Sequence, residues 1–349
     1  EENNKITVYK EAEVVDYSGH VGNFKSKIRC GGKEIELEHG IVIVATGGEE
    51  YKPEEYHYGK SDKIVTQREL EDKIARGNGE LKELKEVVMI QCVGSREQPN
   101  QYCSRVCCSQ AVKNAIRLKE QNPKTRVSIL YRDIRSYSFK EIYYRKAREM
   151  GVNFIRYEAE AKPEVQVDNG KVRVVVKDDL LPSSIQLAPD YLVLSAAIRP
   201  HPENEKLATT FKLPLTTDGF FLEAHMKLRP LDFASLGMFL CGLAHSPKFM
   251  DESIAQAKGA ASRAATILSQ KEMMVGGAVS VVDSERCAAC LTCVRACPYN
   301  VPVITTEGVA EIEAVSCHGC GICASACPRK AIQVQHYKDE QILSKCVAL

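Results

Sequence analysis

Cysteine is the residue type in this sequence with the clearest capacity for chemistry. The chain has 15 Cys in 349 residues, and a chain of this length needs no disulfide framework to replace a hydrophobic core. Metal or redox chemistry is therefore the leading explanation. Eight of these cysteines form two copies of the spacing CxxCxxCxxxCP. The copies are Cys287, Cys290, Cys293 and Cys297 before Pro298, and Cys317, Cys320, Cys323 and Cys327 before Pro328.

This spacing resembles that of the bacterial two-cluster ferredoxins, which bind two cuboidal 4Fe–4S clusters. Three thiolates of one run surround one cluster, and the fourth, which precedes the proline, binds the cluster of the other run. Zinc is the alternative, but structural zinc sites usually use two separated CxxC pairs, which these runs suit poorly. The predicted ligand sets are Cys287, Cys290, Cys293 and Cys327 for one cluster, and Cys317, Cys320, Cys323 and Cys297 for the other.

A second, less regular group of cysteines lies in the segment QCVGSREQPNQYCSRVCCSQ. It contains Cys92, Cys103, Cys107 and Cys108. Spacing alone leaves three explanations open: four ligands of a cluster, a set of buried thiols, or a redox disulfide. The three isolated cysteines, Cys30, Cys241 and Cys346, are expected to serve as small buried hydrophobic residues.

Composition and charge narrow the class of protein. Hydrophobic residues make up 44% and charged residues 27% of the chain, which is typical of globular proteins. Lys and Arg number 47 against 46 Asp and Glu, so there is no basic excess that would favour nucleic acid or an anionic membrane. The longest apolar stretches, 41–48 and 273–282, reach about half of the roughly 18 residues that a spanning helix needs.

The order of predicted elements indicates an α/β protein. Residues 1–40 alternate polar and apolar positions, which predicts short antiparallel strands, and a fully buried strand follows at 40–48. From residue 51, strands alternate with helices, which favours a parallel sheet of the Rossmann type. Strands are expected at 87–91, 126–131, 152–157, 191–197 and 238–241, a hairpin turn at 168–170, and helices at 104–120, 138–150 and 252–268.

Three features in sequence order resemble flavoproteins of the thioredoxin reductase type, which have two dinucleotide-binding domains. These are a strand ending in ATGG, an exit through VLSAAIRP, and TDGFF followed by GMFLCGLAHSPKFMDESIAQAKGAASRAA. The resemblance implies bound FAD, with the late strand and the helix N-terminus facing the flavin. It departs at Leu243, where the family usually has Asp. The implied FAD contacts are Thr46, Gly47, Gly242, Ser253, Ile254, Ala255 and Gln256.

Two glycine motifs of such flavoproteins are missing. The sequence GxGxxG, which lets the FAD pyrophosphate approach a helix, occurs nowhere in the chain. We therefore expect the first part of the flavin domain to lie in a longer protein or on another chain. The same motif is absent after the strand 87–91, where nicotinamide would bind. That position holds Cys92 and the second cysteine group, so a cluster is expected to replace the nicotinamide site.

Taken together, these motifs resemble the HdrA family of heterodisulfide reductases. The signature combines the segment from QCVGSRE to YCSRVCC with the ATGG strand, the IAQAKGAA helix and the double cysteine run. The resemblance implies a third 4Fe–4S cluster bound by Cys92, Cys103, Cys107 and Cys108. The implied domains are 1–50 and 201–272 of the FAD-binding domain, an inserted Rossmann-like domain at 51–200, a linker at 275–278, a two-cluster ferredoxin domain at 279–335, and a loose tail at 336–349.

The resemblance also implies a function. The chain is expected to be a cytoplasmic oxidoreductase subunit that transfers electrons within a multisubunit complex. In this family FAD is the proposed point of electron bifurcation between a hydrogenase or formate dehydrogenase partner, ferredoxin, and disulfide-reducing partners of the HdrB and HdrC type.

Two alternatives stay open at this stage. One is a relay without bifurcation in a quinone-linked or aromatic-CoA-reducing complex, and the other is a scaffold whose clusters only hold the fold. No acid–base or nucleophile set is evident, because the eight His are scattered, and His318 is expected beside a cluster or in solvent.

Overall fold

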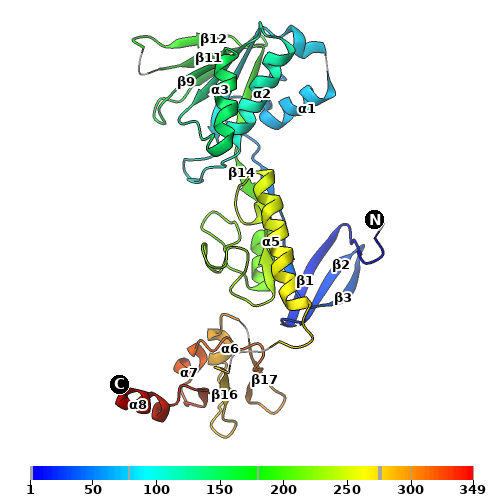
Figure 1. Ribbon diagram of the computed structural model, residues 1–349, viewed down its shortest axis with the longest axis vertical. Coiled ribbons are helices and arrows are strands. Elements are labelled where there is room, and N and C mark those ends of the chain that lie inside the picture. The colour runs from blue at the N-terminus through cyan, green and yellow to red at the C-terminus, as the bar shows by residue number, and fades with distance from the viewer. Residues whose placement is uncertain (1–2, 78, 179–180, 274–276, 300, 349) are drawn as a thin grey trace. The chain divides into compact units, whose positions relative to one another are not determined.

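The computed structural model describes residues 3–77, 79–178, 181–273, 277–299 and 301–348 (Figure 1). Val275 and Gly276 of the predicted linker lie outside these residues. Contacts divide the chain into two units. The inserted unit comprises Thr46–His201 and Ser246–Ser253, and the flanking unit comprises Glu1–Ala45, Pro202–His245 and Ile254–Leu349.

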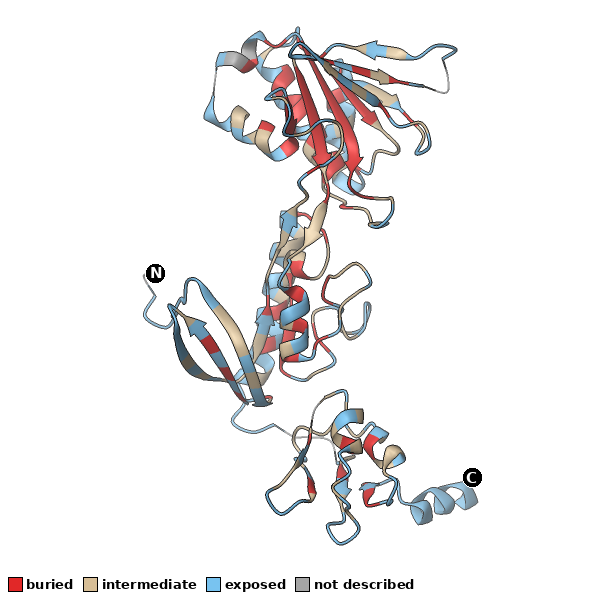
Figure 2. Cartoon of the chain, turned by 180° about the vertical axis from the view of Figure 1, so that it is seen from behind, coloured by how far each residue is buried: buried red, intermediate tan, exposed pale blue. Residues whose placement is uncertain are grey.

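The inserted unit is built on a five-stranded parallel sheet. All eight residues of the central strand, Glu86–Val93, are buried, as is typical of a parallel strand that is covered on both faces. Figure 2 shows the buried strands of this sheet in red. In spatial order the strands are β6 (Ile64–Thr66), β13 (Tyr191–Ala196), β7 (Glu86–Val93), β8 (Arg126–Tyr131) and β9 (Asn153–Arg156).

Different layers cover the two faces of this sheet. On one face Val87 and Met89 pack with Ala111 and Ala115 of a helix, and on the other face Val88 packs with the antiparallel sheet of three strands. The helical elements are α1 (Gln67–Arg76), η1 (Gly79–Glu83), α2 (Cys107–Gln121), η2 (Ser138–Lys140) and α3 (Glu141–Glu149). The antiparallel strands are β10 (Glu164–Asp168), β11 (Lys171–Val176) and β12 (Ile185–Leu187).

Most predicted elements of the inserted unit are confirmed. The hairpin turns at Asn169 and Gly170, which both have positive φ, and α2 begins three residues later than predicted. Helix α1 was not predicted, although Thr66 and Glu69 form a capping box at its start. At the ends of the inserted segment, β5 (Gly48–Glu50) pairs antiparallel with β14 (Ile198–Pro200).

The flanking unit begins with an antiparallel meander, as predicted. Its strands are β1 (Ala12–His20), β2 (Asn23–Cys30) and β3 (Lys33–His39). The next strand, β4 (Val42–Val44), is parallel to β15 (Met238–Leu240). The expectation of a fully buried strand here was wrong, because Ile43 is 38% exposed. Among the described residues, β15 is the sole strand that pairs with β4. A sheet of two strands leaves part of β4 exposed.

Short helices and loops complete the flanking unit's core. Phe24, Phe211, Phe221 and Phe233 pack with Leu240 of β15, and the edge-to-face pair of Phe221 and Phe233 has ring centroids 5.8 Å apart. The helical elements here are α4 (Asn204–Phe211), η3 (Gly242–Ala244) and α5 (Met250–Leu268).

The C-terminal cysteine runs lie in a small module with internal repetition. Each half contributes one short helix that contains the third cysteine of its run, with strands at either side. The strand pairs are β16 (Ser280–Val282) with β19 (Ile332–Val334), and β17 (Pro302–Ile304) with β18 (Ala310–Ile312), and the helices are α6 (Thr292–Ala296) and α7 (Ile322–Ala326).

Most of the predicted tail, 336–349, is helical. Asp339–Ala348 form a helix, α8, in which none of the residues is buried. Leu343 and Val347 lie one turn apart on its surface, at the i, i+4 spacing of an amphipathic helix.

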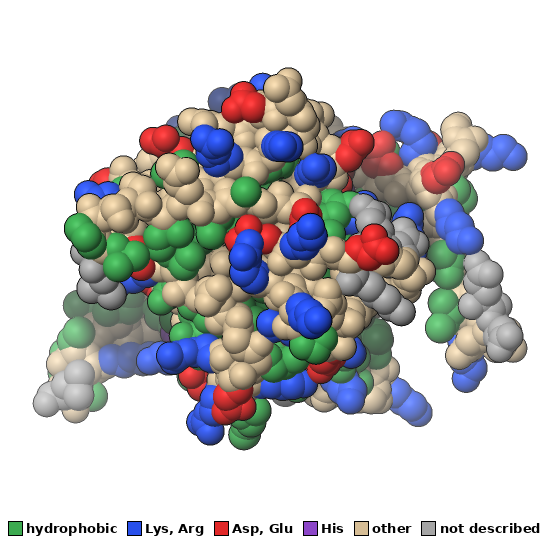
Figure 3. All heavy atoms as spheres, turned by 90° about the horizontal axis from the view of Figure 1, so that it is seen from above, with side chains coloured by type: hydrophobic (Ala, Val, Ile, Leu, Met, Phe, Trp, Pro, Cys, Tyr) green, Lys and Arg blue, Asp and Glu red, His purple; other side chains and the backbone are tan. Residues whose placement is uncertain are grey.

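The surface matches the balanced charge of the sequence. On the face shown in Figure 3, basic and acidic side chains alternate over the surface without a large region of one sign. Among the described residues, none of the helices has the length and apolar character to cross a membrane.

Candidate functional site

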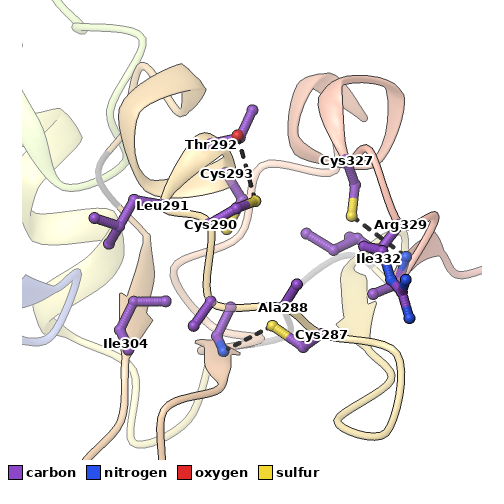
Figure 4. A pocket seen from close by; sticks show the side chains of 13 residues that line it. Cys287, Ala288, Cys290, Leu291, Thr292, Cys293, Ile304, Cys327, Arg329 and Ile332 are labelled. Carbon is purple, nitrogen blue, oxygen red and sulfur yellow. Dashed lines mark hydrogen bonds between the residues drawn. The ribbon is translucent and has the colours of Figure 1, made fainter.

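The structure brings four cysteines of the C-terminal module around one cavity (Figure 4). Cys287, Cys290 and Cys293 come from the first run, and Cys327 comes from the second, where it ends α7. Apolar side chains, among them Ile304, complete the lining. The fourth cysteine thus crosses to the twin run, in the arrangement that the ferredoxin-like spacing predicted.

A second cavity repeats this arrangement with the roles of the runs exchanged. Cys317, Cys320 and Cys323 line it together with Cys297, which ends α6. The two cavities hold about 340 and 310 Å³ of empty space, including the part open to solvent. Their near-equal size and matched ligand types indicate two sites of one kind.

The backbone forms both cavities by the same local device. The residue immediately before each short helix is left-handed: Leu291 with φ 63° before α6, and Gly321 with φ 78° before α7. This conformation turns the chain sharply, so that the cysteines on either side of it face the same cavity. Glycine adopts it at no steric cost, whereas leucine is strained by it, which favours a functional reason for the turn in the first run.

Backbone N–H groups point at the cysteine sulfurs in both cavities. In the first, the N–H of Ala310 lies 3.4 Å from Cys287 Sγ and that of Ala331 lies 3.3 Å from Cys327 Sγ. In the second, the N–H groups of Ser280 and Gly319 lie 3.4 and 3.5 Å from Cys317 Sγ. Such donors stabilise thiolates bound to a cluster, so the donor set fits a 4Fe–4S cluster in each cavity.

Local contacts also shift the acidity of individual thiols. A hydrogen bond with the Thr292 hydroxyl lowers the pKa of Cys290, whereas burial raises the pKa of Cys293 and of Cys323. In the second cavity the ring of His318 stacks on Tyr299 with centroids 3.8 Å apart, and burial lowers the pKa of His318. In the described part of the chain, no three His, Cys, Asp or Glu side chains are arranged to hold a single metal ion.

The second cysteine group is also brought together, from three different elements. Cys92 lies near the end of β7, Cys103 lies in the loop that follows, and Cys107 and Cys108 open α2. The thiol of Cys107 interacts with the thiols of Cys108, Cys92 and Cys103. The hydrogen bond between Cys107 and Cys108 raises the pKa of Cys107 and lowers that of Cys108.

Arginine side chains surround this group, which the sequence analysis did not predict. Arg96 Nη1 lies 3.8 Å from Cys92 Sγ, and Arg135 and Arg96 both favour the ionised form of Cys108. Burial raises the pKa of Cys92, and the charges of Arg96 and Arg132 oppose that effect. Arg132 is held by the carbonyl oxygen of Arg96 at 3.0 Å. Positive charge around four thiols fits a group of net negative charge, such as a thiolate-bound cluster.

The backbone of this segment is unusual in the same region. Cys92, Arg96 and Arg105 all have positive φ, between 59° and 63°, which is uncommon for residues other than glycine and tends to occur at functional sites. Helix α2 begins after Val106 without a side-chain cap. The start of a helix stabilises nearby negative charge, and Cys107 and Cys108 lie in the first turn of α2.

The isolated cysteines were only partly predicted. Cys241 is buried, but Cys30 is half-buried and Cys346 is exposed on α8. Cys30 lies at the end of a strand, and α8 packs no residue into a core, so neither position could bury a side chain fully.

The predicted FAD contacts divide between the two units. Thr46, Gly47 and Ser253 belong to the inserted unit. In the flanking unit the N–H of Gly242 donates to Gln256 Oε1 at 3.0 Å, so these two predicted residues lie together. Ile254 is 49% exposed and Ala255 is also exposed.

A histidine and a glutamate join this group in the flanking unit. His245 Nδ1 lies 3.1 Å from the side-chain nitrogen of Gln256, and His245 Nε2 lies 2.9 Å from Glu223 Oε2. Neither residue was predicted from the sequence, because a histidine three residues after Gly242 has no spacing signal of its own. The chain thus orders the turn after β15 with its own side chains.

Comparison with known proteins gives a family match at the C-terminal module and relatives along most of the chain. Residues 286–332 match the 4Fe–4S dicluster domain family. The chain is 41% identical over 334 residues to the HdrA iron–sulfur subunit of the CoB–CoM heterodisulfide reductase from Methanocaldococcus jannaschii, covering 89% of this chain and 50% of that protein. It is 39% identical over 334 residues to the HdrA subunit of the H2:CoB-CoM heterodisulfide,ferredoxin reductase from Methanothermobacter thermautotrophicus, covering 90% and 50%.

Solved structures give a weaker similarity. The thioredoxin reductase of Lactococcus lactis is 18% identical, with a TM-score of 0.48 and coverage of 74% of this chain and 75% of that chain. The thioredoxin reductase of T. acidophilum is 19% identical, with a TM-score of 0.46 and coverage of 74% and 72%. The sheet topology described above confirms the predicted α/β class. The family match confirms the predicted C-terminal domain with two clusters.

The assignment of the chain to a family rests on its sequence relatives. Their identity with this chain is near 40% over about nine-tenths of its length, and a match of that length spans the segment of the second cysteine group. The chain spans about half the length of the curated relatives it matches. The chain belongs to the HdrA family of heterodisulfide reductases.

Proposed function

We propose that this chain is an electron-transfer portion of a heterodisulfide-reductase-type complex that binds three 4Fe–4S clusters and part of an FAD site. The observation that supports this best is the crossed arrangement of cysteines in the C-terminal module. Each cavity has three cysteines of one run and one of its twin, which is how two-cluster ferredoxins bind their clusters. The proposed ligands are therefore the two sets named above.

The third cluster is proposed at Cys92, Cys103, Cys107 and Cys108. Support comes from the convergence of four buried or half-buried thiols, from the surrounding arginines, and from the uncapped start of α2. A disulfide is the competing explanation, and the thiols are all free in this structure. The segment lies after β7, at the carboxyl edge of the parallel sheet where α/β proteins bind ligands.

The FAD site is proposed to use Thr46, Gly47, Gly242, Ser253, Ile254, Ala255 and Gln256. When bound, a flavin exchanges electrons both in pairs and singly, whereas clusters pass single electrons. Within the flanking unit the chain's own contribution is to fix the turn at Gly242 through Gln256 and His245. The exposed positions of Ile254 and Ala255 leave apolar surface for a planar ring.

The partners in electron transfer are proposed by analogy with the relatives. The names of two relatives include H2 or formate, ferredoxin and the CoB-CoM heterodisulfide. We propose that this chain likewise works between a hydrogenase or formate dehydrogenase partner, ferredoxin and a disulfide-reducing partner, with bifurcation at the flavin. The second candidate is a relay without bifurcation, and flavin half-potentials measured in the intact complex would separate the two.

The decisive experiment is an iron and acid-labile sulfide determination on anaerobically purified protein. Three clusters give about twelve iron atoms per chain, and the ferredoxin-like runs alone give about eight. A value near eight, together with a disulfide between Cys103 and Cys107 or Cys108 found by mass spectrometry, would exclude the third cluster. A value near zero with bound zinc would exclude the clusters of the C-terminal module as well.

A further inference from the structure

The loop residues on either side of Cys103 make contacts that hold the loop in place. The Tyr102 hydroxyl donates to the carbonyl oxygen of Ile198 at 2.7 Å, and the Ser104 hydroxyl accepts from the N–H of the same residue at 2.9 Å. Ile198 begins β14, through which the chain leaves the inserted segment. The cysteine therefore lies between two side chains that are both fixed to one strand.

Arg105 adds a second anchor, directed at the first turn of α5. Its backbone N–H lies 3.3 Å from Cys103 Sγ. Its guanidinium donates to the carbonyl oxygen of Pro247 at 3.2 Å and to Glu252 Oε1 at 2.6 Å. One residue thus contacts both the cysteine sulfur and the residues where α5 begins.

Glu252 links Arg105 to the start of α5. Its second oxygen, Oε2, accepts the N–H of Phe249 at 2.8 Å, three residues earlier, so Glu252 acts as the carboxylate of an N-terminal cap. Burial disfavours the ionised form of Glu252, but the hydrogen bonds from Phe249 and Arg105 outweigh it, and its pKa is lowered. The carboxylate is therefore charged when it holds both the helix start and the guanidinium.

The backbone of Arg105 is in the left-handed region, with φ 59°. A non-glycine residue keeps this strained conformation only where surrounding contacts compensate its cost. Here the guanidinium also contacts the Tyr137 hydroxyl, so three partners from two loops and a helix start hold one side chain. The strain and the contacts together indicate that the direction of this side chain matters.

We propose that Arg105 is a positioning residue that fixes the segment of Cys103 against the first turn of α5, and so sets the separation between the third cluster and the flavin. This inference rests on the proposed function, since it requires the cluster at Cys103 and a flavin beside Ser253, the residue that follows Glu252. Single-electron exchange between two redox groups slows steeply as their separation grows. A fixed separation is therefore a requirement of the relay and not only of the fold.

The test compares variants of Arg105 with a matched control in the intact, anaerobically purified complex. Arg105→Gln removes the charge but keeps a polar side chain, and Arg105→Lys keeps the charge without the planar fork. The control is Lys140→Gln, because Lys140 contacts the same helical turn: its Nζ lies 3.4 Å from Asp251 Oδ2 and 4.1 Å from the centre of the Phe249 ring. The control residue has no contact with the cysteine segment among the contacts of the described residues.

Three readouts are measured: iron content, hydrogen–deuterium exchange of peptides covering 102–108 and 247–253, and the rate of electron exchange between flavin and clusters in a single turnover. For Arg105→Gln we expect an iron content equal to that of the wild-type complex, faster exchange of both peptides, and at least a tenfold slower electron exchange. Arg105→Lys should restore part of that rate. Lys140→Gln should speed exchange of 247–253 alone and leave the electron rate unchanged.

Several results would overturn the inference. An unchanged electron rate in Arg105→Gln with both peptides loosened would make Arg105 a structural residue only. Loss of four iron atoms in that variant would mean that it holds the cluster itself and not the separation. A content of eight iron atoms in this chain alone, without its partners, would remove the third cluster and the proposal with it, and this outcome is visible before any variant is made.

Discussion

The C-terminal cysteine module and the cysteine group of the inserted unit bring their thiols together by different means. In the C-terminal module the ligands follow one another at short, regular intervals, and backbone N–H groups supply the nearby hydrogen bonds. In the inserted unit the thiols come from a strand, a loop and a helix start, and arginine side chains supply positive charge. The regular spacing predicted the C-terminal sites directly. In the inserted unit the four cysteines were expected from the family resemblance, whereas the arginines around them were not predicted.

The difference has a physical origin in burial. Cys290 and Cys320 are exposed, whereas Cys92, Cys107 and Cys108 are all buried. Solvent screens the charge of an exposed cluster, but a buried one needs charges and dipoles within the protein to compensate its own. The inserted unit offers such charges from Arg96, Arg132 and Arg135. We therefore predict that the cluster proposed there depends on more residues than the clusters of the C-terminal module.

The largest expected effect comes from removing ligands of the buried site. In Cys103→Ala/Cys107→Ala, iron should fall from about twelve towards about eight atoms per chain, because one 4Fe–4S cluster is lost. The electron paramagnetic resonance signals of the C-terminal module should be unchanged, since that module has its own core. Loss of all signals in this double variant would contradict the independence of the two sites.

The second effect tests the crossed ligands within the C-terminal module. Cys327→Ser should alter the cluster held by Cys287, Cys290 and Cys293, although Cys327 belongs to the other run, because it lines their cavity. Cys297→Ser is the matched control and should alter the other cluster. The two variants should therefore perturb different resonance signals. If each variant perturbed the cluster of its own run, the crossed assignment would be wrong.

The sequence predicted more of this molecule where local rules dominate. The runs of buried apolar residues located β7, β8 and β13 to within one or two residues, and the cysteine spacing predicted which four thiols share each cavity of the C-terminal module. Helix α1 was missed because its apolar face is narrow, with Leu70 and Gln67 as its buried residues. Helix α8 was missed because a short segment near a terminus suggests disorder, and α8 has no buried face to mark it.

The parts of the sites that could not be predicted depend on contacts far apart in sequence. Arg105 meets Glu252 across 147 residues, and His245 meets Glu223 only through the turn after β15. Neither pair shows a spacing in the sequence that would predict its contact. The left-handed backbone at Cys92 and Arg96 could not be predicted from the sequence either, because that conformation is expected mainly for glycine and asparagine.

A smaller effect concerns the potential of the buried cluster. Arg96→Gln removes a positive charge whose Nη1 lies 3.8 Å from Cys92 Sγ. Because reduction adds negative charge to a cluster, a nearby cation favours the reduced state, so its loss should lower the reduction potential. The expected size is on the order of 59 mV, or tenfold in a one-electron equilibrium. Redox titration followed by electron paramagnetic resonance measures it.

The control for that titration is another arginine of the same unit. Arg117 lies on the exposed side of α2, where its side chain is 65% exposed and pairs with Glu120. Arg117→Gln should leave the potential unchanged, since solvent screens a charge in that position. Equal shifts in both variants would show that net charge, and not the charge beside Cys92, sets the potential.

The smallest effect compares the two helix starts of the inserted unit. Helix α1 has a capping box, in which Thr66 Oγ1 accepts the N–H of Glu69 at 3.3 Å and the Glu69 carboxylate accepts the N–H of Thr66 at 2.7 Å. Helix α2 has no such cap, and its first turn carries Cys107 and Cys108. Side chains therefore satisfy the first N–H groups of α1, while those of α2 stay available to the thiolates and to the cluster proposed there.

Thr66→Ala should thus destabilise α1 by about 1 kcal/mol, the usual cost of losing a helix cap. The measurement is hydrogen–deuterium exchange of residues 66–76, and Thr66→Ser, which keeps the hydroxyl, should restore the protection. Iron content should stay near twelve, because none of the proposed ligands lies in α1. If Thr66→Ala released iron as well, the sheet edge at β6 and the cysteine segment would form one cooperative unit, and the buried site would depend on residues even more distant than its arginines.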